Sequence, residues 1–504
     1  PFETDTNGYL RGRGQIALGD RVIALQPITH TERYVVYHTS AAPMVVGVDA
    51  NEIMQLGEQV LTVSAENPLM LFNFDVSLEW DATQDPDFLT RLDLDLQRSS
   101  EILYDLSNGQ AALGNVNVYQ NKVRWYESDI VVLADNTHRP NANLGGIVSE
   151  PVSDTLKSGE VISFAALPGQ IRMGATWNRY GNPDGTLGED WPRVLAHEIG
   201  HYAFFLLDNY LGIDDQTGLL RNIDCQGSLM TDAYRQDYSE FVSRATLNSA
   251  GYSWSGNCID TLAEDTTGRS DWETIQTFYP FLHDKLAQTA DGPSRQPFAF
   301  TSVEIHTPNN SVVLLASPIF YMEDNAGNAL ALADGAARAY LIQTNDVATS
   351  EDDTIVSLGS PRGQVINARG MRAGDRLCIF NQANTPPRLG CLDQVTPLSS
   401  TIRLVEFPAW QPEIGVQPVN STTLAITVTQ ASVVGDLHVQ LFPSDRPTTT
   451  IIAPTVPLTS LGGGVYAAEI STPLTIFNAH VRLFDDGNSA ETITRFSQTP
   501  GWSG

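Results

Sequence analysis

The sequence predicts a multidomain protein in which one α/β domain is flanked by all-β domains. The chain has 504 residues, whereas a single hydrophobic core rarely grows beyond about 250 to 300 residues. Most of it alternates short apolar runs with turn residues, which is typical of strands. One internal stretch instead carries apolar residues at helical spacing. We therefore expect domains at residues 1–74, 75–295, 297–405 and 406–504.

The first of these domains is expected to be small and all-β. Residues 1–74 contain short apolar runs such as RVIALQPI, RYVVYH and QVLTVSA, which are separated by turn residues. This spacing predicts a series of short strands. No cluster of charged or aromatic residues marks a site there.

The pattern changes near residue 75, where a helix is expected between strands. The run DVSLEWDA predicts a strand, and NVNVYQ and DIVVLAD predict two more. Between them, apolar residues recur at helical spacing up to Gly109, namely Phe88, Leu92, Leu96, Ile102, Leu103 and Leu106. A second helix is expected with Asp190 as its N-cap and Pro192 in its first turn. A third is expected from about 270 to 286, before a linker near 295. Helices among strands favour an α/β layer.

The two C-terminal spans are expected to be β-sandwiches. Residues 297–405 and 406–504 contain strand-like runs such as ARAYLIQT, RLCIFN and DLHVQLFP. Each span is close to the roughly 100 residues of a sandwich domain. They are similar to transthyretin-like or immunoglobulin-like modules, which serve as spacers, adhesion units or cleft extensions. Self-association is expected to run through these domains.

Composition excludes two classes of partner and favours one location. The formal charge is −30, and an acidic surface repels phosphate backbones, so nucleic acid is excluded. No apolar run reaches the roughly 18 residues of a membrane span. The surface is poor in lysine and rich in uncharged polar residues, which favours an extracellular protein, secreted or on the cell surface. The chain starts PFETDT, which we interpret as a signal segment absent or already removed.

The four cysteines allow three pairings. Neighbours in sequence would join Cys225 to Cys258 and Cys378 to Cys391. The second pair brackets IFNQANTPPRLG, which predicts two strand ends joined by a Pro-Pro loop. No CxxC pair indicates a zinc ribbon. The alternative is four buried free thiols; disulfides would favour an oxidising compartment.

The stretch AHEIGHYAFFLLDNY, residues 196–210, carries the strongest chemical signal. Positions i and i+4 share one helix face, so His197 and His201 can bind one zinc ion. Glu198 lies beside that ion and can act as general base towards its water. A catalytic zinc needs a third protein ligand, and Asp208 is the nearest candidate. Reaching it requires the helix to end by about residues 205–207.

Other interpretations of this stretch remain open. Weaker candidates for the third ligand are Asp214, Asp215 and Asp224. If the helix holds no metal, His197 and His201 are simply two surface histidines. The residues that flank them are strongly apolar, however, which indicates a core helix, where burying unpaired histidines costs free energy. A binding module stabilised by a structural zinc ion would need a fourth protein ligand. His138 and His283 are distant in sequence, so only the folding of the chain could bring either of them to the site.

These residues resemble the metzincin peptidases, whose pattern is H-E-x-x-H-x-x-G-x-x-H followed by a Met-turn. His197, Glu198 and His201 match it, and Met230 in CQGSLMTD resembles the Met-turn. Phe204 and Leu207 stand at the family's glycine and third histidine. A nearer resemblance is to the metalloprotease domain of the calcium-activated chloride channel regulators, with H-E-x-x-H-x-x-x-G-x-x-D-E. There Asp208 and Asn209 take the places of the last two residues, and Phe205 takes that of the glycine.

The resemblance implies a fold, a cofactor and a way of binding substrate. The domain would be metzincin-like, hold Zn²⁺, and bind an extended protein or peptide substrate by strand addition to the sheet's lower edge. Met230 would pack beneath the histidines without touching the ion. Tyr234 is a candidate transition-state donor, with a core tyrosine as the alternative. The Gly/Asn/Asp-rich loops before the helix indicate either plain turns or a Ca²⁺ loop.

We therefore expect a secreted or cell-surface zinc-dependent endopeptidase that hydrolyses peptide bonds through zinc-bound water with Glu198 as general base. The alternative is an extracellular structural or adhesive surface protein that forms polymers. In that case the metalloprotease domain is vestigial or self-processing. The β-domains without a visible site favour this alternative.

Overall fold

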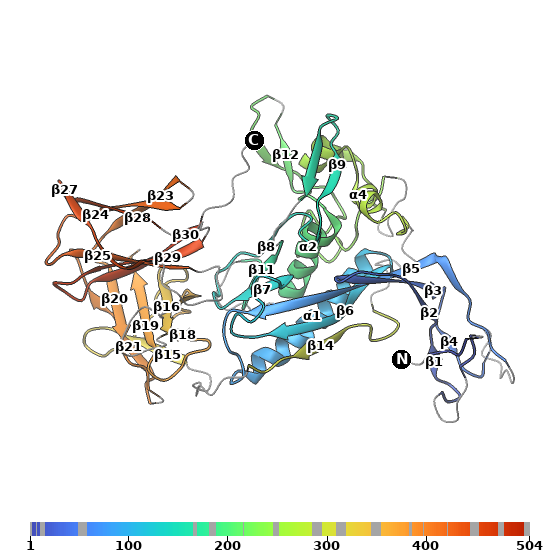
Figure 1. Ribbon diagram of the computed structural model, residues 1–504, viewed down its shortest axis with the longest axis horizontal. Helices are drawn as coiled ribbons and strands as arrows, with labels where there is room; N and C mark the ends of the chain where they lie inside the picture. Colours follow the sequence, from blue (N-terminus) through green and yellow to red (C-terminus); the bar gives the residue numbers. More distant parts are fainter. Residues whose placement is uncertain are drawn as a thin grey trace.

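A computed structural model describes the chain at residues 3–6, 8–10, 16–48, 58–164, 169–180, 188–214, 216–244, 251–284, 295–308, 319–343, 354–382, 386–396, 398–420, 422–443, 453–471 and 478–497. Strands dominate it and form several sheets. In Figure 1 the orange and red strands of the C-terminal half form a lobe beside a central sheet that carries the main helices. The expected multidomain, largely β organisation is confirmed.

The central sheet contains eight described strands. They are β2 (Leu25–His30), β3 (Tyr34–Ser40), β5 (Val63–Leu78), β6 (Ala111–Tyr119), β7 (Ile130–Leu133), β8 (Asn141–Ala142), β11 (Ile171–Gly174) and β14 (Ser302–Ile305). Along its main path the order is β14-β6-β5-β7-β11-β8, and all neighbours are parallel except β8, which runs antiparallel to β11. β3 and β2 extend the first half of β5. The short strand β8 therefore forms an edge.

The central sheet crosses two of the expected domain boundaries. β5 is 16 residues long and runs through the boundary placed between 74 and 75. Its first half pairs with β3 and its second half with β6 and β7, so residues 25–40 belong to this sheet. β14, beyond the linker near 295, pairs with β6. Strand pairing joins residues distant in sequence, which a boundary drawn from local composition does not detect. Among the strands described before residue 75, β1 (Arg21–Val22) and β4 (Met44–Val45) pair with each other and not with the central sheet.

Two long helices pack on the sheet and on each other. In α1 (Pro86–Leu106) all six of the predicted apolar positions are buried, and the Asp85 side chain caps the Phe88 N–H. α2 spans Asp190–Phe204 and has Pro192 in its first turn, as predicted. The N-cap differs: Glu189 takes that place without a side-chain cap bond. The Asp190 carboxylate instead accepts hydrogen bonds from the backbone and guanidinium of Arg179.

Smaller elements surround the helices. They are β9 (Val152–Thr155), β10 (Val161–Phe164), β12 (Leu211–Ile213), β13 (Leu220–Asn222), η1 (Gly256–Asp260), α3 (Leu262–Thr267) and α4 (Asp271–Phe278). α4 starts with a capping box between Ser270 and Glu273. It ends at Phe278 and does not continue to about 286 as expected. Tyr279 precedes Pro280, and the residue before a proline is pushed out of the helical region; residues 285–286 lie outside the described chain.

The C-terminal half contains two pairs of sheets. The first pair comprises β15 (Ile319–Glu323), β18 (Val365–Asn367) and β21 (Thr401–Arg403), and then β16 (Arg338–Gln343), β17 (Thr354–Gly359), β19 (Arg376–Asn381), β20 (Arg388–Leu392) and β22 (Val405–Glu406). The second pair comprises β23 (Glu413–Asn420), β24 (Thr423–Thr429), β27 (Thr459–Gly462) and β28 (Val465–Ser471), and then β25 (Leu437–Pro443), β26 (Ala453–Pro457), β29 (Asn478–Asp485) and β30 (Glu491–Ser497).

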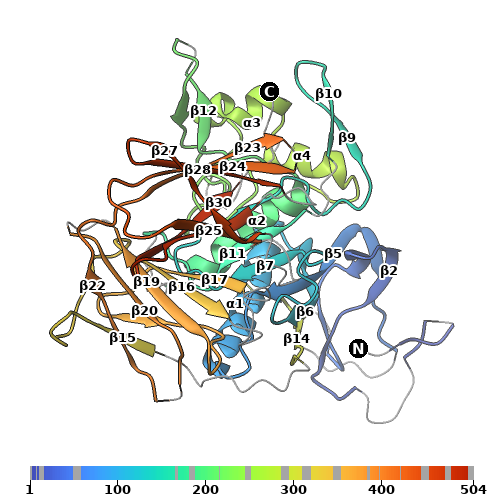
Figure 2. The same ribbon diagram turned by 60° about the vertical axis from the view of Figure 1, so that its left-hand side comes forward.

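These modules share hydrophobic cores with their neighbours. Along β16, Ala339 and Leu341 belong to a cluster that continues into the central sheet domain. Tyr340 and Ile342 belong to a different cluster, which contains the last two sheets. Alternate residues of a strand point to opposite faces, so the five-stranded sheet is buried on both. In Figure 2 this orange sheet lies below the red strands and beside the helix α1 of the central domain.

Both expected disulfides are present. Cys225 pairs with Cys258, and Cys378 pairs with Cys391. The second bond joins directly opposite residues of β19 and β20, the two strand ends predicted around the Pro-Pro loop. In the described part of the chain, no helix is both long and apolar enough to span a bilayer.

Candidate metal centre

The fold brings together the three side chains predicted to hold a metal. His197 and His201 lie one turn apart on α2, and their Nε2 atoms are 3.1 Å from each other. The Asp208 Oδ1 atom lies 3.2 Å from each of these nitrogens. Tetrahedral ligands about 2.0 to 2.1 Å from a zinc ion are separated by about 3.3 to 3.4 Å. The observed triangle is close to that size.

Backbone carbonyls orient both imidazoles. His197 Nδ1 donates to Leu229 O at 3.1 Å, and His201 Nδ1 donates to Leu206 O at 2.6 Å. Because a carbonyl only accepts, each Nδ1 carries a proton, and in the neutral imidazole each Nε2 keeps a lone pair. Such an outer hydrogen bond is the usual partner of a metal-binding histidine. The two lone pairs therefore point to the same place as the Asp208 oxygen.

Three electron-rich atoms at this distance require a positive occupant. Asp208 Oδ1 is buried and has no aligned hydrogen-bond partner. A proton is one occupant: burial lowers the pKa of His201, but the adjacent Asp208 carboxylate outweighs it and raises the pKa to about 9. A divalent cation is the other. Two imidazole nitrogens and one carboxylate oxygen are ligands that zinc accepts, so the residues fit this ion.

Phe205 makes the turn that brings Asp208 back to the helix. It adopts the left-handed conformation (φ 62°, ψ 24°) directly after α2, at the position where the related pattern has glycine. This conformation costs a residue with a Cβ about 1 to 2 kcal/mol. The buried Phe205 ring stacks on Phe278 at a centroid distance of 3.7 Å and meets Phe164 edge-on at 5.1 Å. Aromatic packing thus offsets the strain, and the chain turns without glycine.

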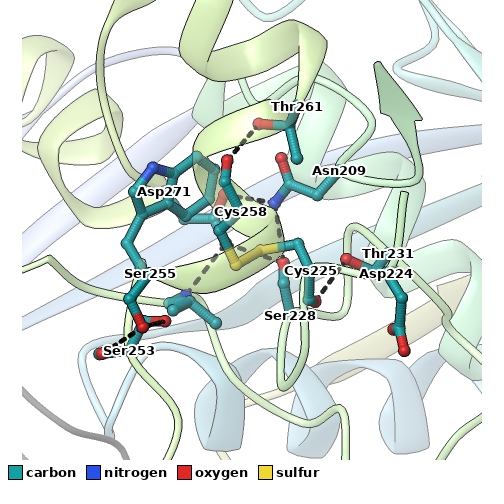
Figure 3. Close-up of a disulfide and its surroundings, with 12 residues drawn as sticks. Asn209, Asp224, Cys225, Ser228, Thr231, Ser253, Ser255, Cys258, Thr261 and Asp271 are labelled. Carbon is teal, nitrogen blue, oxygen red and sulfur yellow. Dashed lines mark hydrogen bonds between the residues drawn. A yellow bond between two sulfur atoms is a disulfide. The ribbon is translucent and has the colours of Figure 1, made fainter. Parts of the chain in front are cut away.

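A buried polar network fixes the residue after Asp208. Asn209 Nδ2 donates to Asp271 Oδ1 at 2.8 Å and to Ser228 Oγ at 3.0 Å, and Ser228 Oγ donates to Asp271 Oδ2 at 2.8 Å. Burial raises the pKa of Asp271 to about 6, although these hydrogen bonds oppose the rise. Figure 3 shows the network beside the Cys225–Cys258 disulfide. Sequence reasoning missed it, because single Asn, Ser and Asp residues form no periodic pattern.

Met230 lies against α2 at Gly200. Its side chain is fully buried. A Cβ added at Gly200 would lie 2.6 Å from the Met230 Sδ atom, so the methionine packs directly against the glycine and a larger residue there would displace it. The Met230 carbonyl also accepts the Asn209 N–H at 3.0 Å. The turn at residues 228–230 therefore supports both the helix and the segment that carries Asp208.

Glu198 opens onto a cleft of about 830 Å³ together with the three clustered side chains. Burial raises the pKa of its carboxyl group, and the two histidines oppose that rise. The edge strand β8 contributes Asn141 and Ala142 to the cleft wall. A carboxyl group beside the metal-ligand cluster and in contact with the cleft has the placement that a general base needs.

Two tyrosines line the cleft. Tyr234 is not enclosed in the core: it lines the cleft, and its hydroxyl accepts a hydrogen bond from Trp177 Nε1 at 2.8 Å. Tyr210, which sequence reasoning missed, lines the cleft two residues after Asp208. Burial raises the pKa of Tyr210, and Asp208 adds to the rise as its hydrogen-bond partner. Tyr210 could have been predicted as a site residue from its position two residues after Asp208 in the sequence.

Other candidate ligands lie elsewhere. Asp214 accepts hydrogen bonds from Thr217 in an exposed turn, and Asp224 accepts one from the Tyr238 hydroxyl. Asp215 lies outside the described residues. His283 Nε2 contacts Ala65 O. Among the described residues, the cluster at the helix contains three ligands and neither His138 nor His283.

Two further groups of residues are weaker candidates for binding an ion. Cys378, Cys391 and Glu491 also lie close together. Their sulfurs form a disulfide, however, and Glu491 is paired with Arg376 and Arg482. For the Ca²⁺ loop expected before α2, residues 181–187 lie outside the described chain, so that prediction stays open.

Comparisons with known proteins do not assign the chain to a family. No protein-family model and no curated protein matches the chain. A two-domain fibronectin type-III segment of chicken tenascin matches with 11% identity and a TM-score of 0.14, over 34% of this chain and 89% of that one. The FN1–FN3 domains of chicken CNTN1 match with 8% identity and a TM-score of 0.15, over 36% of this chain and 66% of that one. Likeness at these TM-scores does not bear on fold or function.

Proposed function

We propose that this protein is a zinc-dependent endopeptidase with a metzincin-like catalytic domain, secreted or at the cell surface. The observation that carries the proposal is the triangle of His197 Nε2, His201 Nε2 and Asp208 Oδ1, with sides of 3.1 to 3.2 Å, beside Glu198 in an open cleft. The two disulfides support an oxidising compartment.

The order of the central sheet supports a metzincin-like domain. Five parallel strands end in the short antiparallel strand β8, which forms one wall of the cleft. An edge strand presents unpaired backbone groups to a partner. An extended peptide that adds to β8 would pass the clustered side chains of α2, and strand addition is a common way to bind peptides. Met230 beneath Gly200 supports the same assignment.

The residues of the chain have separate tasks in peptide hydrolysis. His197, His201 and Asp208 would hold the ion, which supplies Lewis-acid chemistry by lowering the pKa of water towards 7 and by polarising a carbonyl. Glu198 accepts a proton from the attacking water and returns it to the leaving amine. The Tyr234 hydroxyl accepts from Trp177, so its own proton is available to a substrate oxygen.

The test combines metal analysis with peptide cleavage. Wild type and Glu198→Gln should both contain about one zinc per chain, but only wild type should cleave an unstructured protein such as casein. Glu189→Gln is the matched control: it makes the same change just before α2, where Glu189 pairs with Arg98 outside the cleft. Equal cleavage by wild type and Glu198→Gln, or absence of zinc from both, would refute the proposal.

A further inference from the structure

We propose that Arg139 selects substrates that carry a carboxylate close to the scissile bond. The inference rests on the proposed function and names its substrate class. Arg139 is exposed and lines the same cleft as His197, Glu198 and Asp208. It is the only arginine or lysine among the described residues of the cleft wall. A guanidinium forms two parallel hydrogen bonds to a carboxylate, which makes it a specific reader of that group.

Arg139 is free to bind a ligand. In the described part of the chain, its guanidinium forms no ion pair with a carboxylate. The other charged residues of the cleft wall are Glu198, Asp208 and Asp232. Of these, Asp208 faces the two histidines, and the Asp232 carboxylate accepts the Tyr234 N–H at 2.9 Å. Asp208 and Asp232 therefore have other partners, and the positive charge of Arg139 is left for a substrate.

Arg139 lies in the same cleft as the groups proposed to react. It lies two residues before the edge strand β8, with Pro140 between them, at the end of the wall along which a peptide would add. It shares this cleft with Glu198, Tyr210 and Tyr234. A substrate carboxylate bound here would lie close to the bond being cleaved.

The loop that carries Arg139 is hydrogen-bonded to the segment around the end of β17, which is not part of the central sheet. Asn136 Nδ2 donates to Ser360 O at 2.8 Å, and Asn136 Oδ1 accepts from Ser360 N at 2.8 Å. Asp135 accepts from Ser357 Oγ at 2.8 Å. A Cβ added at Gly359 would lie 2.1 Å from Asn136 Oδ1, so the two segments touch directly. The β17 segment thus fixes the loop before a substrate arrives, which lowers the entropic cost of binding.

The overall charge of −30 opposes an acidic substrate at long range. At physiological ionic strength the Debye length is about 8 Å, so charges spread over the surface are largely screened. A direct guanidinium–carboxylate contact with two parallel hydrogen bonds is screened much less. The local contact therefore outweighs the diffuse repulsion, and the preference should persist at 0.15 M salt.

The test uses pairs of quenched fluorescent peptides, made from a sequence that the wild type cleaves. One arm replaces each neutral residue flanking the scissile bond in turn by Glu or by Gln, with the C-terminus amidated. The other arm keeps the neutral sequence and compares a free C-terminal carboxylate with an amide. Wild type should favour the carboxylate member of one arm by about 10- to 100-fold in kcat/KM. The arm that responds tells whether the carboxylate belongs to a side chain or to a chain end.

Variants then assign the preference to Arg139. Arg139→Gln should abolish the discrimination while cleavage of the neutral peptide continues, and Arg139→Glu should favour a Lys-containing peptide. Arg388→Gln, on strand β20, is the matched control and should behave as wild type. No discrimination by wild type, or an equal loss on carboxylate and neutral peptides in Arg139→Gln, would overturn the proposal. Both results leave zinc content and the Glu198 dependence intact, so they differ from a failure of the proposed function.

Discussion

Asn136, three residues after β7, and Ser360, directly after β17, exchange two hydrogen bonds of 2.8 Å across 224 positions of sequence. Ser360 is fully buried. This contact connects the sheet that carries the cleft to the first β-sandwich, and Figure 2 shows β17 beside the central sheet. The loop joined in this way continues into Arg139 and β8. The sandwich therefore helps to build the cleft and is not merely a spacer.

Asn136→Ala should weaken the cleft rim. Loss of the two bonds leaves Ser360 groups without partners, and the free energy of unfolding should fall by about 1 to 3 kcal/mol. The discrimination between carboxylate and neutral peptides should fall as well, with kcat on the neutral peptide retained. Chemical denaturation and peptide kinetics measure both. Asn328→Ala, in an exposed turn of the same sandwich, should change neither. If Asn136→Ala is less stable than wild type but still discriminates between the two peptides, the contact stabilises the fold without contributing to substrate selection.

Asp208→Asn should remove the third ligand while the fold is retained. A neutral amide is a much weaker zinc ligand than a carboxylate, so zinc affinity should fall by more than about 100-fold. Chelation should lower the Tm of wild type, because an ion that binds only the folded state stabilises it. It should not change the Tm of Asp208→Asn. Asp214→Asn, in an exposed turn, serves as control. Retention of wild-type affinity by Asp208→Asn would exclude this ligand.

Phe205 should tolerate glycine better than alanine. Both changes lose the stack on Phe278, which costs about 3 to 5 kcal/mol for a buried phenylalanine. Glycine also removes the left-handed strain of about 1 to 2 kcal/mol, and alanine keeps it. Phe205→Gly should therefore be the more stable of the two variants in urea denaturation, and both should be less stable than wild type. The reverse order of the two variants would contradict the role of this conformation.

Asp271 should make stability depend on pH. Burial raises its pKa to about 6 in the folded protein, against about 3.9 in the unfolded chain. The folded state then holds the proton more tightly, so the stabilisation is complete below about pH 3.9 and is lost as pH rises through about 6. Relative to Asp271→Asn, which is neutral throughout, the free energy of unfolding of wild type should fall by about 2 kcal/mol between pH 4 and pH 7. A constant difference between the two would exclude the shift.

Local patterns in the sequence predicted several features correctly. The apolar positions of α1 follow from a period of 3.6 residues, and the two disulfides join the cysteines nearest in sequence. The spacing of His197 and His201 places both on one helix face, because residues four apart are neighbours on a helix. Each of these relations spans a short stretch of chain, and steric and periodic rules act at that range.

Long-range packing decided the rest. The pairing of β5 with β3 erased the expected boundary at 74, and Pro280 shortened the last helix. Tertiary contacts with Phe278 let Phe205 take a glycine's conformation and carry Asp208 to the histidines. From its residues alone, the chain determined which groups are able to bind a metal. Only the folded molecule decided that their lone pairs meet, because that depends on contacts between segments that no local period connects.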